Sequence, residues 1–196
     1  MATIVRLRYD QRLASERLGG ELAAMLDRMG LGDRPPLFLC IGTDRSTGDA
    51  LGPLVGQQLQ AALPLWDGRV LGTLEQPVHA GNLAETLAGL RSEAEEPAVV
   101  AVDACLGRAE SVGTVCVGVG PLVPGAGVNK SLPEVGSAHV TGTVNVGGFM
   151  EYFVLQNTRL QLVMGMATVI ADGLTHAARL LHEARSRTAL ADAAPW

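Results

Sequence analysis

Short, uninterrupted apolar runs alternate with longer segments of helical periodicity in the middle of the chain. The runs at 37–42 ("LFLCIG") and 98–104 ("AVVAVDA") are typical of strands buried on both faces of a sheet. Between them the pattern predicts helices over about 49–63 and 81–93, and a strand over 69–74. This rhythm with short connections predicts an α/β fold, a three-layer sandwich with a mainly parallel central sheet.

The flanking segments extend the same plan. At 196 residues the chain has the length of one domain, 1–196. The further elements expected are an N-terminal helical segment within 1–35 with its apolar stripe over 9–28, strands at 113–120 and 137–146, helices at 149–156 and 159–185, and a flexible tail at 187–196.

Composition and charge indicate which binding partners and which cellular compartment to expect. Acidic residues outnumber basic ones, 20 to 15, which gives no electrostatic reason to expect nucleic acid or an anionic membrane as partner. The charge-free run 111–129 contains glycines and prolines that argue against a membrane span. The N-terminus has no long apolar stretch of a secretory signal, so a cytoplasmic location is expected. The three cysteines lack the spacing of a zinc site or a disulfide framework.

Polar chemistry gathers directly after the first buried run, in the loop "TDRSTGD" at 43–49. In an open parallel sheet, ligands bind beyond the carboxyl ends of the strands, which is where this loop lies. Gly48 allows a tight turn into the following helix. Asp49 has two interpretations, because an aspartate at or near a helix N-cap also accepts hydrogen bonds from free backbone amides.

A second carboxylate makes a functional interpretation of Asp49 stronger. Asp103 ends the apolar run "VVAVD", so it too is expected at the carboxyl end of a strand. If the two strands are neighbours, Asp49 and Asp103 face one cleft. Two carboxylates held close in partial burial share a proton, and such a pair suits acid and base catalysis of peptide hydrolysis.

Other interpretations of the candidate residues remain open at this stage. A divalent ion on the two aspartates would need a third ligand such as His79 or His139. His79 precedes a predicted helix, a position more typical of a capping-region or core histidine than of a catalytic one. Asn129 and Lys130 lie at the tip of a glycine-rich turn that lacks the spacing of a phosphate-binding loop.

Four motifs in order resemble the YyaC family of sporulation proteins of endospore-forming Firmicutes. They are "IGTDRSTGDALGPLVG", "VVAVDACLG", "GPLVPGAGVNKSLPEVG" and "VNVGGFMEYFVLQNTRLQLVM". More distantly, "GDALGPLV" and "AVDA" are similar to the germination protease of spores, an aspartate-dependent endopeptidase that degrades small acid-soluble spore proteins. That resemblance implies a phosphorylase/hydrolase-like fold and catalytic roles for Asp49 and Asp103. A fainter similarity to hydrogenase maturation endopeptidases implies a metal ligand near Asn145, where this chain has no histidine.

The function expected from the resemblance is a sporulation or germination endopeptidase of the mother cell or forespore. Its substrate is expected to be a protein or peptide, with small acid-soluble spore proteins as candidates, and no cofactor or metal is expected. The rival is a non-catalytic binding or assembly protein on the same scaffold, motivated by the strongly apolar segment 149–171, and self-association stays open. The residues expected to bind substrate are Thr43, Asp44, Arg45, Gly48, His79, Asn129, Lys130 and Asn145.

Overall fold

A six-stranded, mainly parallel sheet forms the centre of the protein. The computed structural model describes residues 4–64, 66–93, 97–125 and 132–192. The sheet order is β1-β5-β6-β4-β2-β3. β5 runs antiparallel to both of its neighbours, β1 and β6, and the other neighbouring pairs are parallel. The strands are β1 (Ile4–Arg8), β2 (Leu37–Cys40), β3 (Arg69–Leu71), β4 (Val99–Gly107), β5 (Thr114–Val119) and β6 (Ala138–Val146).

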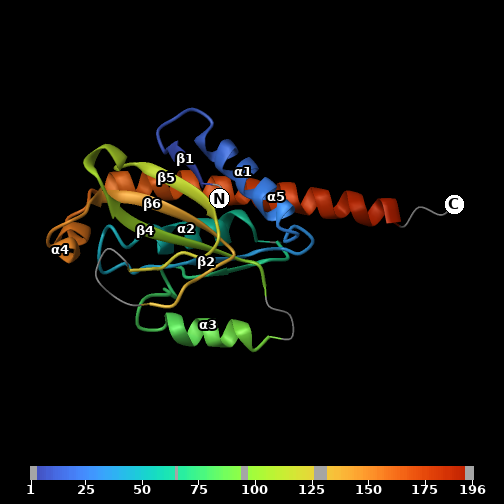
Figure 1. The fold of residues 1–196 in the computed structure, drawn as a ribbon, viewed down its shortest axis with the longest axis horizontal. Coiled ribbons are helices and arrows are strands. Elements are labelled where there is room, and N and C mark those ends of the chain that lie inside the picture. Colours follow the sequence, from blue (N-terminus) through green and yellow to red (C-terminus); the bar gives the residue numbers. More distant parts are fainter. Residues whose placement is uncertain (1–3, 65, 94–96, 126–131, 193–196) are drawn as a thin grey trace.

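Helices cover both faces of this sheet, which confirms the predicted three-layer α/β sandwich. In Figure 1, α1 and the long α5 lie over one face, and α3 lies alone on the other. The helices are α1 (Ala14–Arg28), α2 (Leu51–Ala62), α3 (Leu83–Arg91), α4 (Glu151–Gln156) and α5 (Leu160–Asp192), with a 3₁₀ turn at Ala109–Ser111. Within the described residues, no helix is long and apolar enough to cross a membrane.

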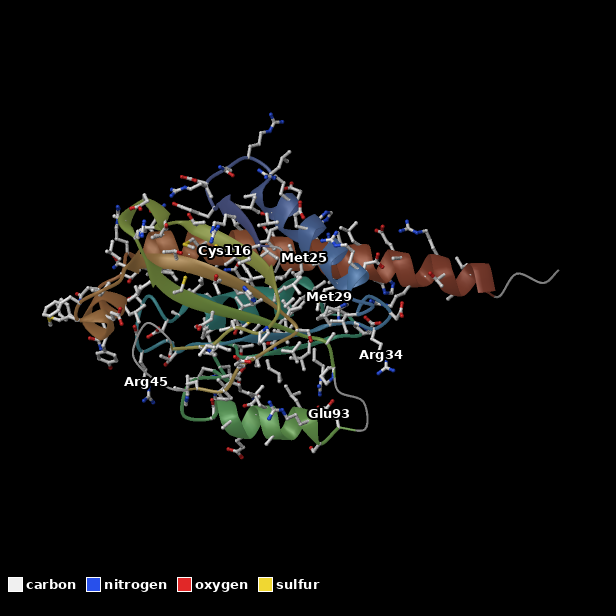
Figure 2. The ribbon with its side chains drawn as sticks, viewed as in Figure 1. Met25, Met29, Arg34, Arg45, Glu93 and Cys116 are labelled. Carbon is white, nitrogen blue, oxygen red and sulfur yellow. The ribbon has the colours of Figure 1, made fainter. Side chains whose placement is uncertain are left out.

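Alternation along β2 explains why its apolar run is continuous. Phe38 and Cys40 belong to the core cluster that includes residues of α1, α2 and α5, and Met25 of α1 belongs to the same cluster (Figure 2). Leu37 and Leu39 point to the opposite face and pack with residues of α3. A strand buried on both faces leaves no position for a polar side chain, so polar chemistry begins only where β2 ends.

Several element boundaries differ from those predicted, and β3 ends at Leu71, before the predicted end at residue 74. The N-terminal segment holds an edge strand, β1, as well as a helix, and its signal is weak because only Leu7 of its five residues is buried. β4 continues to Gly107, beyond the predicted end at residue 104. The final helix extends to Asp192, beyond its predicted end at residue 185.

Close packing at the start of α2 gives the first prediction. A Cβ at Gly52 would meet the backbone of Ile41, whereas a Cβ at Gly20 in α1 would meet nothing within 4 Å. Gly52→Ala should therefore lower the free energy of unfolding by about 1–3 kcal/mol, as overpacking does. Gly20→Ala should instead be neutral or stabilising by up to about 1 kcal/mol.

Chemical denaturation of the two variants and the wild type measures the difference. Equal effects of the two substitutions would contradict the close approach of α2 to the end of β2.

Candidate active site

Backbone hydrogen bonds fold the loop after β2 against its neighbours. Ile41 donates its N–H to the carbonyl of Val102 in β4 at 2.7 Å, and Gly42 donates to Val78 at 2.8 Å. Thr43 donates to the carbonyl of Asp49 at 3.1 Å, which closes the loop on itself. The N-cap of α2 is Ala50, so Asp49 is the residue before the cap.

The strands β2 and β4 are parallel neighbours, as the sequence interpretation required. Cys40, the last residue of β2, pairs with Val102. Asp103 is the next residue of β4, and it pairs only on its other side, with Thr141 of β6. Asp103 therefore lies beside the point where β2 ends, although it is in the middle of its own strand.

Both aspartates line one cavity of about 480 Å³, here called the large cavity. Each of the two side chains is half-buried. Four of the residues predicted to bind substrate share the lining of the large cavity: Thr43, Asp44, Arg45 and His79. Arg45 is exposed and extends away from the sheet at the edge of the molecule (Figure 2).

The environment of Asp103 favours its protonated form. Burial is the largest cause, and it raises the pKa of Asp103 from its ordinary value of 3.8 to about 8; the negative charge of Asp49 acts in the same direction. Hydrogen bonds from the backbone amides of Ala104, at 2.9 Å, and Gly125 oppose the shift but do not cancel it. The raised pKa of Asp103 therefore favours a proton on the pair at neutral pH.

His79 has a structural role as well as a place in the lining of the large cavity. Its backbone N–H donates to the side chain of Asn82 at 2.8 Å, just before α3. Its ring Nδ1 accepts a hydrogen bond from Gly81 at 3.1 Å. His79 thus takes part in the hydrogen-bonded turn before α3 and also lines the large cavity.

Two predicted residues support the site from outside its lining. Gly48 is buried, and its N–H donates to the carbonyl of Leu155 at 2.9 Å. Asn145 donates from Nδ2 to the carbonyl of Val154 at 3.3 Å and to Oγ1 of Thr158 at 3.2 Å. Gly48 and Asn145 therefore hold α4 in place and do not contact the large cavity.

The remaining predicted positions are outside the site or outside the described residues. Asn129 and Lys130 lie outside the described residues. His139 donates from Nδ1 to the carbonyl of Gly120 at 2.9 Å, and it lines neither of the cavities that contain the aspartates. In the part of the chain that the structure describes, no group of three or more His, Cys, Asp or Glu side chains is arranged to hold a metal ion.

Two polar side chains of the large cavity, those of Ser46 and Tyr152, were not among the predicted site residues. Tyr152 of α4 lines it from a segment whose apolar pattern indicated only a helix. Ser46 is buried in the same lining, and its hydroxyl has no hydrogen-bond partner among the described residues. The only signal for Ser46 was its place in the polar loop.

Comparison with known proteins places the chain in a family. Residues 6–173 match the family model described as "Protein of unknown function (DUF1256)". The chain is also 58% identical over 142 residues to the uncharacterized protein YyaC of Bacillus subtilis (strain 168), covering 72% of this chain and 69% of that protein. The chain therefore belongs to the DUF1256 family, and the expected kinship with YyaC is confirmed.

The raised pKa of Asp103 predicts how stability depends on pH. The folded protein keeps the Asp103 proton up to about pH 8, whereas the unfolded chain loses it near pH 3.8. Between these values the folded state binds more protons, so its stability falls as pH rises, by at most about 1.4 kcal/mol per pH unit. Asp103→Asn removes this dependence, so the variant should gain stability relative to wild type from pH 5 to pH 8.

Denaturation curves at several pH values measure this gain. Asp172→Asn, at an exposed position of α5, is the matched control and should run parallel to wild type. A constant difference between Asp103→Asn and wild type across this range would show that Asp103 ionises normally.

Proposed function

We propose that this protein is an endopeptidase in which Asp49 and Asp103 activate water for the hydrolysis of a peptide bond. The observation that carries the proposal is geometric: the two carboxyl groups line the same cavity, where burial and the negative charge of Asp49 raise the pKa of Asp103. The resemblance of "GDALGPLV" and "AVDA" to the germination protease supports the same two residues.

The pair divides the work of a general base and a general acid. Asp49, as the carboxylate, takes a proton from water while the water oxygen attacks the carbonyl carbon of the substrate. Asp103 gives its proton to the amide nitrogen as the C–N bond breaks, and the proton on Asp49 then restores the shared state. Each such transfer contributes about 10²–10⁴-fold to a rate.

Residues around the pair supply contacts for a polypeptide. Arg45 and Asp44 offer charged groups at the mouth of the large cavity. In a sporulating cell the substrate is a cytoplasmic protein of the mother cell or forespore, with small acid-soluble spore proteins as the first candidates. The proposed chemistry needs no cofactor.

The decisive substitutions remove one carboxylate each without changing its size. Asp49→Asn and Asp103→Asn should each lower the rate of cleavage of purified small acid-soluble spore proteins, or of unfolded casein, by at least about 100-fold. Gel electrophoresis and mass spectrometry of the products measure the rate, and circular dichroism checks that the variants are folded.

Asp172→Asn, far from the pair in the sequence and exposed on α5, should cleave like the wild type. Cleavage at the wild-type rate by both pair variants would refute the proposed mechanism.

A binding or assembly function is the second candidate, and one surface feature favours it. The segment before and within α4 exposes large apolar side chains, with Phe149 81% and Phe153 56% exposed, whereas Val163 to Ala171 of the same apolar stretch is largely buried. Contiguous exposed apolar residues mark interaction sites. Two results together would favour this function. The wild type, but not the Phe149→Ser/Phe153→Ser variant, would recover a partner from sporulating cells, and the wild type would show no cleavage.

A further inference from the structure

The two aspartates stand between two cavities. A second cavity of about 210 Å³, here called the small cavity, lies next to the large one. The two cavities share Asp49, Asp103 and Gly125 in their linings. A substrate bound across the carboxyl groups can therefore extend to both sides of them.

The sheet forms one wall of the small cavity. Asp103 pairs with Thr141, and Cys105 pairs with Thr143, so all four side chains lie on the same face of β4 and β6. Sγ of Cys105 lies 3.4 Å from Oγ1 of Thr143. Burial raises the pKa of the Cys105 thiol, so this side chain remains neutral.

Aliphatic side chains form the rest of the small cavity. They come from the end of β4, the segment after β5, and α4: Leu106, Leu122, Val123 and Leu155. Leu122 and Val135 exchange two backbone hydrogen bonds of 2.9 Å, which fixes the segment that carries this wall. Apart from the two aspartates, no charged residue of the described chain lines the small cavity.

The volume of the small cavity matches a single side chain. Pockets for whole small-molecule ligands are commonly about 300–1,000 Å³, which is larger than the small cavity. An apolar cavity of about 150 Å³ holds one benzene molecule. The small cavity at about 210 Å³ thus has room for one aliphatic or aromatic side chain and little more.

We propose that the small cavity is a specificity subsite that receives one uncharged apolar side chain of a polypeptide, next to the bond that lies over Asp49 and Asp103. The large cavity takes the residues on the other side of that bond. This inference rests on the proposed endopeptidase function and adds to it the substrate class: an extended chain with a leucine-sized or phenylalanine-sized residue at one position beside the cleaved bond.

Val123 allows a test that leaves the fold and the aspartates unchanged. It lines the small cavity and is 47% exposed, so Val123→Asp places a carboxylate at the cavity mouth without burying it in the core. Val146→Asp is the matched control, because Val146 is 43% exposed and lines neither cavity. Val123→Ile keeps the apolar character of the wall.

The probes are labelled ten-residue peptides of Gly, Ala and Ser with one central Leu, Phe, Asp or Lys. Fluorescence anisotropy with the full chain measures binding, and mass spectrometry of the same samples records cleavage. The Leu and Phe peptides should bind wild type, Val123→Ile and Val146→Asp at least tenfold more tightly than the Asp and Lys peptides. Val123→Asp should lose that preference.

The binding measurement tests the subsite, and the mass spectrometry tests the proposed hydrolysis. Equal binding of all four peptides to wild type, or a preference that survives Val123→Asp, would overturn the subsite. A preference that follows this pattern without any cleavage would uphold the subsite and count against hydrolysis.

Discussion

The site depends on the fact that β2 ends before its neighbour β4 does. β2 ends opposite Val102, and β4 continues through Asp103 in its pairing with β6. Asp103 is thereby held by the sheet on one side and faces the loop after β2 on the other. Burial of this carboxyl group raises the pKa of Asp103, and the negative charge of Asp49 acts in the same direction.

The surrounding structure maintains this arrangement through backbone contacts. Gly52 lets α2 begin against the backbone of Ile41, and the loop between them closes through the hydrogen bond from Thr43 to Asp49. Gly48 and Asn145 hold α4 at the edge of the cavity. These contacts leave a neutral acid and a second carboxyl group between two cavities of unequal size. Burying an acidic group lowers the free energy of unfolding, and strongly perturbed pKa values of this kind cluster at functional sites.

Much of the fold could be predicted because its signals are local. The run "LFLCIG" and the run ending in Asp103 indicated buried strands, and the strand and helix rhythm indicated a mainly parallel sheet. That the two strands are direct neighbours was only a condition of the sequence interpretation, and the structure supplies it. The edge strand β1 was missed because an exposed edge needs few apolar residues. The sequence could suggest that Asp49 and Asp103 meet, but not the two cavities, since cavities arise from side chains that are distant along the chain, such as Tyr152 and Val123. For the same reason Gly48 and Asn145 looked like ligand contacts, although their partners are in and just after α4.

The most direct test is a titration of the Asp103 carboxyl carbon by ¹³C NMR, in the wild type and in Asp49→Asn. The account predicts a pKa of about 8 for Asp103 in the wild type. It also predicts a lower value in Asp49→Asn, because the neighbouring negative charge is gone while the burial remains. An Asp103 carboxyl group that titrates near 3.8 in the wild type, or whose titration is unmoved by Asp49→Asn, would contradict the coupled pair on which the account rests.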